Sequence, residues 1–172
     1  MDRIIIFGFS GSGKSTLASK MGEMLGIEPT HMDALHWLPN WVESDVEHKV
    51  KLLAPVLECK QWIVDGTYRR ILWKERLDLC DTAVFLDVNR FVCFYQTWKR
   101  SRIYKGKTRP DMGKGCKEKF DLEFAKWVFF DGRKKRKKCL AEIEYLKNNG
   151  KNTYILKSRK DINNFLKGIE TV

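Results

Sequence analysis

The chain has 172 residues, of which 43% are hydrophobic and 12% are aromatic. This apolar content excludes disorder as the general state, and the length suffices for one hydrophobic core, so we expect residues 1–172 to form a single domain. The formal net charge of +11 predicts a negatively charged ligand, such as nucleic acid, an acidic lipid or small phosphates.

The expected location of the protein follows from features that the sequence lacks. No stretch approaches the roughly 18 consecutive apolar residues that a membrane span needs, and the N-terminal residues lack the long apolar centre of a signal peptide. The five cysteines are scattered and form no C-x-x-C pair, which argues against a disulfide framework or a cysteine zinc site. We therefore expect a cytoplasmic protein with reduced cysteines and no membrane partner.

Apolar runs alternate with amphipathic stretches along the chain, beginning with a strand at residues 3–8 and a helix at 14–25. Further strands are expected near residues 29–33, 61–65, 82–87 and 152–157, and further helices near 44–58, 89–104 and 117–147 and at the C-terminal end. Strands separated by helices imply crossover connections, and hence an α/β fold with a parallel sheet covered on both faces. The polar, glycine-rich stretch 104–119 lies between two expected helices, which is typical of a surface lid.

The stretch GFSGSGKST, which starts at Gly8, matches the phosphate-binding pattern G-x-x-x-x-G-K-[ST]. Its glycines let backbone N–H groups turn toward a phosphate, and the following helix adds its positive N-terminal end. Lys14 supplies positive charge toward the outer phosphates, and the hydroxyl of Ser15 can bind Mg²⁺. We predict that a nucleoside triphosphate is bound by Gly8, Ser10, Gly11, Ser12, Gly13, Lys14, Ser15 and Thr16. The motif alone leaves open whether the triphosphate serves phosphoryl transfer, hydrolysis or nucleotide-gated binding of nucleic acid.

Three aspartates, Asp33, Asp65 and Asp87, follow apolar runs and can lie at the carboxyl edge of the sheet. Each could provide the second Mg²⁺ contact that phosphoryl transfer needs, or could cap the helix that follows it. For Asp87 we favour the capping role.

Asp65 differs from the other two aspartates because glycine and two arginines follow it. Gly66 allows close backbone approach, and Arg69 and Arg70 come within one turn. Guanidinium groups match phosphate oxygens, so these arginines are predicted to hold a second phosphate-bearing group. Exposed arginines that form surface salt bridges are the alternative.

The stretch HMDALHW, residues 31–37, offers a different acceptor chemistry. His31 and Asp33 are two residues apart at an expected strand end, so their side chains point to one side. Asp33 could act as a general base for a hydroxyl acceptor, with His31 positioning the same group; an acceptor that is already a phosphate needs no base. His31 is equally compatible with a structural, partly buried histidine. Trp37 and Trp41 could form an aromatic wall for a ring-bearing acceptor or belong to the core.

Two basic segments remain. The stretch 104–119 and the residues just before it carry several lysines and arginines between glycines, which suits closure over phosphates. The stretch contains a single cysteine, Cys116, so we predict no zinc site there. The run GRKKRKK, residues 132–138, is either a nucleic-acid surface or a solvated helix face. We favour the solvated face, with Arg133 or Arg136 directed at the lid.

Several motifs together resemble the DNA topology modulation protein family, small bacterial P-loop proteins related to adenylate kinase. The resemblance rests on HMDALHW (31–37), DGTY (65–68), KTRPDMGKG (107–115) and FDLEFAKW (120–127) and extends over nearly the whole chain. It implies a three-layer α/β/α P-loop fold like that of nucleoside monophosphate kinases, with a five-stranded parallel sheet of order 2-3-1-4-5 and an ATP site. Tyr68 stands where adenylate kinase has a proline.

The resemblance also implies roles for individual residues. Lys14 and Ser15 would contact ATP and Mg²⁺, Asp65 would lie near Mg²⁺, Arg69 would bind the acceptor, and Arg109 would belong to the lid. The predicted catalytic residues are Lys14, Asp33, Asp65 and Arg109, and the predicted metal ligands are Ser15 and Asp65. The predicted acceptor-binding residues are His31, Asp33, Trp37, Asp65, Tyr68, Arg69, Arg70 and Arg100.

We therefore expect an ATP- and Mg²⁺-dependent kinase for a nucleotide, a nucleoside or a similar small molecule. The alternative is a nucleotide-gated DNA-binding protein that affects DNA topology through the lid and the run at 132–138. We do not favour it, because the sequence contains no recognisable DNA-binding module. The sequence indicates no particular oligomeric state.

Overall fold

The computed structural model describes residues 1–109, 111–113, 115–118 and 120–170. Its centre is a five-stranded sheet in which every pair of neighbouring strands is parallel. The strands are β1 (Arg3–Gly8), β2 (Pro29–His31), β5 (Trp62–Asp65), β6 (Thr82–Leu86) and β7 (Asn152–Leu156). Their order in the sheet is β2-β5-β1-β6-β7, which is 2-3-1-4-5 when only these strands are counted. The predicted sheet is confirmed.

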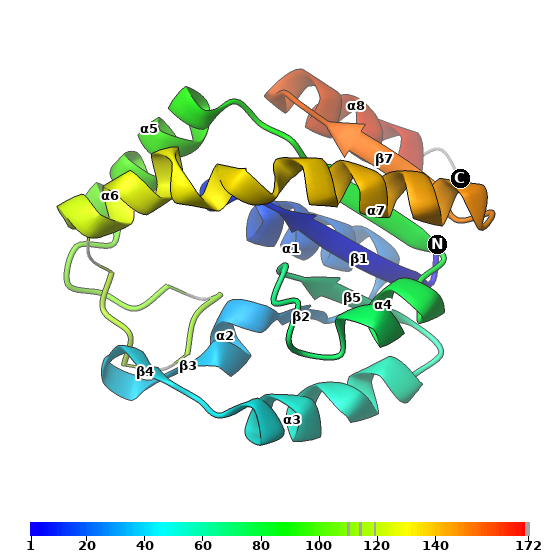
Figure 1. The fold of residues 1–172 in the computed structure, drawn as a ribbon, viewed down its shortest axis with the longest axis horizontal. Coiled ribbons are helices and arrows are strands. Elements are labelled where there is room, and N and C mark those ends of the chain that lie inside the picture. The colour runs from blue at the N-terminus through cyan, green and yellow to red at the C-terminus, as the bar shows by residue number, and fades with distance from the viewer. Residues whose placement is uncertain (110, 114, 119, 171–172) are drawn as a thin grey trace.

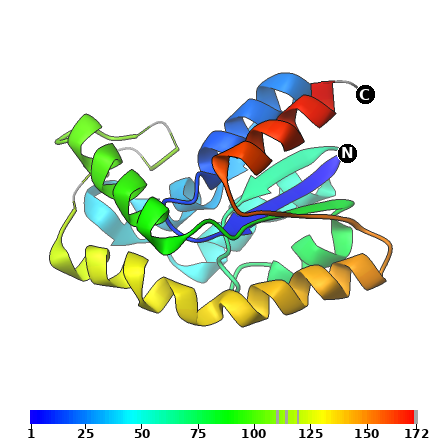
Figure 2. The same ribbon diagram turned by 90° about the horizontal axis from the view of Figure 1, so that it is seen from above.

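Helices cover both faces of this sheet and complete the three layers (Figures 1 and 2). The first helix, α1 (Lys14–Leu25), contacts β1, β5 and the last helix, α8 (Arg159–Glu170), on one face. On the other face, α4 (Trp73–Leu79) contacts β1, and α7 (Arg136–Asn148) contacts β6 and β7. Helix α3 (Val46–Glu58) lies beyond the β2 edge (Figure 1).

The central strands are buried along all or most of their length, because helices cover both faces. All residues of β5 and β6 are buried, and so are Ile4, Ile5, Ile6 and Phe7 of β1. The ring of Phe7 stacks on Phe85 at 5.3 Å and meets the edge of Trp73 at 5.5 Å. These strands therefore hold the carboxyl edge of the sheet in a fixed position.

The prediction of one helix over residues 117–147 is wrong. Helix α6 (Leu122–Phe129) begins where the Asp121 carboxylate accepts a hydrogen bond from the Phe124 N–H. It ends before a 3₁₀ segment, η2 (Asp131–Lys135), and α7 follows. Gly132 at the junction has a low helix propensity, which weakens continuation of the α-helix. Figure 2 shows α6 and α7 running end to end along one side of the molecule.

The segment after β2 contains elements that the sequence analysis did not predict. Helix α2 (Met32–His36) leads into β3 (Trp37–Leu38), the 3₁₀ turn η1 (Pro39–Trp41) and β4 (Val42–Glu43). Strands β3 and β4 form a small antiparallel hairpin. Among the described residues, no helix is both long enough and apolar enough to span a membrane.

The stretch between α5 (Arg90–Ile103) and α6 lies against this hairpin. The indole N–H of Trp41 donates to the Lys117 carbonyl oxygen at 2.8 Å, and the thiol of Cys116 lies 3.2 Å from the Leu38 carbonyl oxygen. A Cβ atom on Gly113 would lie 2.0 Å from the backbone oxygen of Trp37, so the two backbones pack closely. Of the expected lid, positions 110, 114 and 119 lie outside the described residues.

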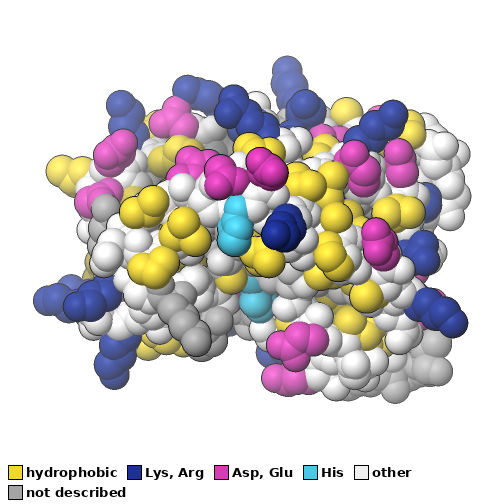
Figure 3. All heavy atoms as spheres, turned by 90° about the horizontal axis from the view of Figure 1, so that it is seen from below, with side chains coloured by type: hydrophobic (Ala, Val, Ile, Leu, Met, Phe, Trp, Pro, Cys, Tyr) yellow, Lys and Arg dark blue, Asp and Glu magenta, His cyan; other side chains and the backbone are white. Residues whose placement is uncertain are grey.

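Figure 3 shows the molecule from the side on which α3 lies in Figure 1. On this face several acidic side chains gather beside a histidine, and most of the lysine and arginine side chains lie toward the margins. The net charge of +11 is therefore not spread evenly over the surface.

Candidate active site

The loop between β1 and α1 has the backbone shape that a phosphate cradle requires. Gly11 and Gly13 have φ angles of 74° and 94°, in the left-handed region that favours glycine. A Cβ atom on Gly11 would lie 2.3 Å from the backbone oxygen of Cys93, so a larger residue does not fit there. Gly13 directly precedes α1, and the loop therefore opens onto the positive end of that helix.

The polar side chains of this loop fit a triphosphate. The hydroxyl of Ser12 is buried and has no hydrogen-bond partner among the described residues. An unpaired buried hydroxyl is costly, so a phosphate oxygen would be a favourable partner for it. The ammonium group of Lys14 donates to the Phe9 carbonyl oxygen at 2.9 Å and so remains beside the loop. Of the other predicted ATP ligands, Gly8 ends β1, Ser10 and Ser15 are half-buried, and Thr16 is exposed.

Asp65 ends β5, next to β1 in the sheet, and its residue is 3% exposed. Among the described residues, no three His, Cys, Asp or Glu side chains are grouped so that they could hold a metal ion. Mg²⁺ in nucleotide sites commonly uses one or two protein oxygens together with phosphate oxygens and water. The Asp65 carboxylate and the Ser15 hydroxyl have the chemistry for this kind of site.

His31 and Asp65 are paired across neighbouring strands, as the register of β2 with β5 places them opposite each other. The Nδ1 atom of His31 donates to Oδ1 of Asp65 at 2.9 Å. Burial lowers the pKa of His31, but the hydrogen bond and charge of Asp65, with the charges of Asp111 and Asp33, outweigh it and raise the pKa. Three carboxylates therefore act on this one imidazole.

Asp33 lies in the first turn of α2, and its partner is Tyr68. The phenol of Tyr68 donates to Oδ1 of Asp33 at 2.6 Å. Burial raises the pKa of Tyr68, and the negative charges of Asp33 and Asp65 raise it further, so the phenol keeps its proton. The sequence placed Asp33 and Tyr68 in the same site but did not reveal this hydrogen bond.

The aromatic side chains near Asp33 form a continuous group. The ring of Trp37 meets Trp41 at 5.5 Å and His36 at 4.6 Å, and His36 lies 4.5 Å from Tyr68. Trp37 and Trp41 are each half-buried, so part of each ring remains accessible. The geometry suits an aromatic wall, and its role in acceptor binding stays a prediction.

The two arginines after Asp65 point to different surroundings. Arg69 binds both carboxylate oxygens of Glu142 in α7, at 2.7 and 3.0 Å, and its guanidinium lies 5.2 Å from the centre of the Trp73 ring. Arg70 is exposed. Of the predicted acceptor-binding arginines, Arg69 therefore forms a salt bridge, as in the alternative that the sequence analysis left open, but this salt bridge is largely buried rather than exposed.

The lid arginines also bind carboxylates. Arg109 is 7% exposed, and it lies 2.8 Å from Asp111 and 2.7 Å from Glu118. Arg100, near the end of α5, lies 3.0 Å from the same Glu118. Burial and the charge of Arg109 lower the pKa of Arg100. The structure thus brings these two predicted site residues together around one buried glutamate.

The prediction that Asp87 caps a helix is wrong. Its backbone N–H donates to the Leu156 carbonyl oxygen at 2.9 Å, so the chain still follows the sheet at this point. Helix α5 is capped by Asn89, whose side chain accepts from the Phe91 N–H. The carboxylate of Asp87 instead binds Arg136 through contacts of 2.7 to 3.1 Å.

The basic run at 132–138 divides into two kinds of residue. Its lysines are exposed, as expected for a solvated face. Arg133, however, lies over the Phe9 ring of the phosphate loop at 3.9 Å and donates to the Val88 carbonyl oxygen. The sequence analysis directed Arg133 or Arg136 at the lid; in the structure Arg133 lies against the phosphate loop and Arg136 binds Asp87.

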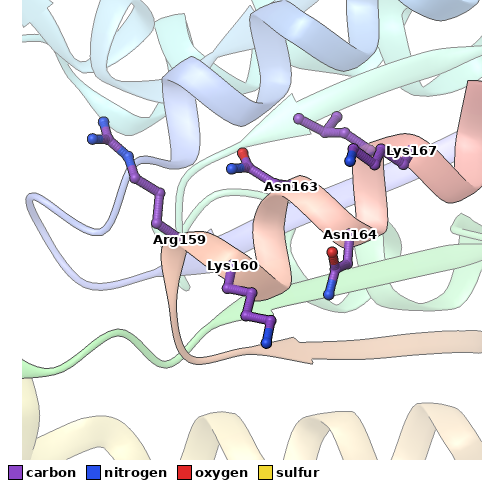
Figure 4. A pocket seen from close by; sticks show the side chains of 6 residues that line it. Arg159, Lys160, Asn163, Asn164 and Lys167 are labelled. Carbon is purple, nitrogen blue, oxygen red and sulfur yellow. The ribbon is translucent and has the colours of Figure 1, made fainter.

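A surface hollow lies apart from these residues, along α8 (Figure 4). Its lining comes only from that helix, namely Arg159, Lys160, Asn163, Asn164, Leu166 and Lys167. Because it contains none of the predicted site residues, we do not assign it to the site.

Solved structures with a similar fold include small P-loop kinases. Shikimate kinase from Acinetobacter baumannii, in complex with shikimate, matches with a TM-score of 0.59 and 14% identity over 98% of this chain and 90% of that chain. Shikimate kinase from Bacteroides thetaiotaomicron matches with a TM-score of 0.55 and 19% identity over 99% and 96% of the two chains. Deoxyadenosine kinase from M. mycoides with bound dATP matches with a TM-score of 0.55 and 14% identity over 99% and 98%.

These similarities show that the chain has the α/β fold of small P-loop kinases, with its five-stranded parallel sheet. No protein-family model matches the chain, and no curated protein does.

Proposed function

We propose that the protein is an ATP- and Mg²⁺-dependent kinase that transfers a phosphoryl group to a nucleotide, a nucleoside or a similar small molecule. The observation that carries the proposal is the complete phosphate loop at residues 8–15. The buried Asp65 lies at the end of β5, the strand next to β1 in the sheet. The solved structures of similar fold include a shikimate kinase with shikimate and a deoxyadenosine kinase with dATP, which supports a small-molecule acceptor.

The residues of the phosphate loop would bind and orient the triphosphate. Backbone N–H groups, the Ser12 hydroxyl and the Lys14 ammonium would offset the charge that develops during transfer. Mg²⁺, when bound by Ser15 and Asp65, supplies further charge neutralisation at the phosphates. Arg133, held over the loop by Phe9, adds a positive charge on the same side.

We further propose that residues 1–172 form a single kinase domain and that the segment 104–119 is its lid. The described part of this segment packs on the β3–β4 hairpin, and the charge of its Asp111 acts on His31. A segment in this position would exclude water from the transfer, which limits hydrolysis of ATP.

The proposal is tested by measuring ATP-dependent phosphorylation over a panel of nucleosides, nucleoside monophosphates and small alcohols. We expect at least one compound to be phosphorylated, with loss of the activity in Lys14→Ala. Lys20→Ala, an exposed lysine of the same helix, is the matched control and should retain it. If no compound reacts, and DNA instead binds with a steep dependence on salt, the protein is a nucleic-acid-binding protein and not a kinase.

A further inference from the structure

The arginines that would recognise a phosphate on the acceptor already bind carboxylates. Arg69 binds Glu142 through two oxygens, and Arg109 lies within 2.8 Å of both Asp111 and Glu118. A phosphate-binding arginine needs free N–H groups directed at the ligand. These side chains therefore stabilise the protein's own loops and helices, and an acceptor phosphate would have to displace a partly buried carboxylate.

A further carboxylate, that of Glu43 in β4, lies beside the basic side chain of Lys49. Lys49 is buried and donates to Glu43 at 3.1 Å. The pKa of Glu43 is lowered first by this hydrogen bond, and then by the charges of His36, Lys49 and Arg70. Arg70 is exposed, and its charge is the last of the causes that lower the pKa of Glu43.

Two carboxylates of the candidate site, those of Asp33 and Asp65, have no arginine partner among the described residues. Asp33 receives a hydrogen bond from Tyr68, and Asp65 receives one from His31. Asp65 would be balanced by His31 and by Mg²⁺, whereas Asp33 is bound by the neutral phenol of Tyr68. The charge of Asp33 would therefore repel a phosphate monoester, but not a neutral or cationic group.

We propose that the acceptor is a hydroxyl compound without an anionic group, either uncharged or positively charged, and that Asp33 takes the proton of the reacting hydroxyl. This inference rests on the proposed kinase function. The half-buried rings of Trp37 and Trp41 would contact the apolar part of the acceptor.

The position of Asp33 fits a general base. Its Oδ1 atom accepts from Tyr68 at 2.6 Å, and its side chain makes no other hydrogen bond among the described residues, which leaves Oδ2 for the acceptor. In the transfer, the acceptor oxygen forms a bond to the γ-phosphorus of ATP, and the bond from that phosphorus to the β–γ bridging oxygen breaks. The hydroxyl proton moves to Asp33, and ADP leaves with the bridging oxygen. Tyr68 is a positioning residue that holds the carboxylate.

The acceptor class is tested with purified full-length protein, ATP and Mg²⁺ on two sets of compounds. One set contains nucleosides, polyols and amino alcohols, and the other contains nucleoside monophosphates. Phosphorus NMR distinguishes a new phosphate monoester from a new diphosphate. We expect monoester products, with kcat/KM at least tenfold higher than for any nucleoside monophosphate.

Two failures of this test have different meanings. If nucleoside monophosphates become diphosphates while the hydroxyl compounds stay unchanged, the inference is overturned and the kinase function stands. If neither set reacts, the kinase function fails and the inference fails with it.

The role of Asp33 is tested by Asp33→Asn, which keeps the size of the side chain and the hydrogen bond from Tyr68. We expect kcat to fall about 10²- to 10⁴-fold, as for loss of a general base, with the KM for ATP unchanged. Tyr68→Phe should lower kcat less and shift the pH profile. Asp78→Asn, an exposed carboxylate of α4, is the matched control. Equal kcat values for Asp33→Asn and the unaltered protein would show that Asp33 is not the general base.

Discussion

Arg76 is the fully buried arginine of α4, and it fixes the loop that carries Tyr68. Its guanidinium donates to the carbonyl oxygens of Gly66, Tyr68 and Ile71 at 2.8 to 3.0 Å. Burial lowers the pKa of Arg76 to about 9, and the opposing charge of Glu75 does not outweigh it. The Asp33–Tyr68 contact therefore depends on a side chain outside the site.

Arg76→Ala should destabilise the protein by about 3–5 kcal/mol, since three buried or partly buried carbonyl groups lose their donor. The free energy of unfolding in urea measures this change. Lys74→Ala, at an exposed position of the same helix, should alter it by less than about 0.5 kcal/mol. A loss for Arg76→Ala as small as that of the control would show that the loop does not need these hydrogen bonds.

Asp81 joins the starts of β1 and β6 through its carboxylate. Its Oδ2 accepts from the backbone N–H groups of Asp2 and Arg3, both at 2.8 Å, and its Oδ1 accepts from the Thr82 hydroxyl at 2.6 Å. Burial raises the pKa of Asp81, but these hydrogen bonds outweigh it and lower the pKa below its ordinary value.

A carboxyl whose pKa is lower in the folded state stabilises the fold above its unfolded pKa, and the stabilisation disappears as the pH falls through the folded pKa. Asp81→Asn should therefore cost about 1–2 kcal/mol at neutral pH, and the difference from the unaltered protein should shrink below about pH 4. Urea unfolding at a series of pH values measures it. A difference that stays constant down to pH 2.5 would contradict the assignment.

At the scale of elements, the ion pair of Arg69 with Glu142 connects the loop after β5 to α7. Both side chains are largely buried, at 15% and 12% exposure, and the indole N–H of Trp73 donates to the same carboxylate at 3.0 Å. Removing one partner leaves a buried charge unpaired, which is why such pairs show strong coupling.

A double-mutant cycle of Arg69→Ala and Glu142→Ala should give a coupling free energy of about 1–3 kcal/mol in unfolding experiments. Glu144→Ala, an exposed residue of α7, should show no coupling to Arg69→Ala. Because Arg69 is bound to Glu142, Arg69→Ala should lower the free energy of unfolding and leave the KM for the acceptor nearly unchanged. If Arg69→Ala keeps full stability but loses acceptor binding, Arg69 binds the acceptor as the sequence predicted.

The elements that the sequence predicted well depend on local signals. The strands β1, β5 and β6 are continuous apolar runs, and the phosphate loop is a contiguous motif between a strand and a helix. Parallel order followed from their alternation with helices and from the family resemblance. Predicting these features does not require knowing which residues far apart in the chain are in contact.

The errors concern contacts between residues far apart in the chain. Asp87 was assigned to the helix that follows it, yet its partner Arg136 is 49 residues away. The sequence also did not reveal that Arg69 pairs with Glu142, 73 residues further along; its binding of an acceptor stays a prediction. A charged side chain shows its chemistry in the sequence, but the group that neutralises it is determined by packing.

At the scale of the whole molecule, the candidate site is assembled from the carboxyl ends of several strands. The phosphate loop follows β1, Asp65 ends β5 and His31 ends β2, and these strands lie side by side in the order β2-β5-β1. A ligand bound at this edge would contact elements that come apart only when the sheet unfolds. Its binding free energy should therefore add to the stability of the entire fold.

ATP with Mg²⁺ at a hundred times its dissociation constant should stabilise the folded state by about 2.7 kcal/mol. For a chain of this size the midpoint of thermal unfolding should then rise by about 5–10 °C. The rise should disappear in Lys14→Ala and persist in Lys20→Ala, and EDTA should reduce it because the phosphates then lack their metal partner. Addition of the true acceptor with a non-hydrolysable ATP analogue should raise the midpoint further, in the unaltered protein and in Lys20→Ala. An equal rise with and without the Lys14 ammonium would mean that ATP binds elsewhere than at the phosphate loop.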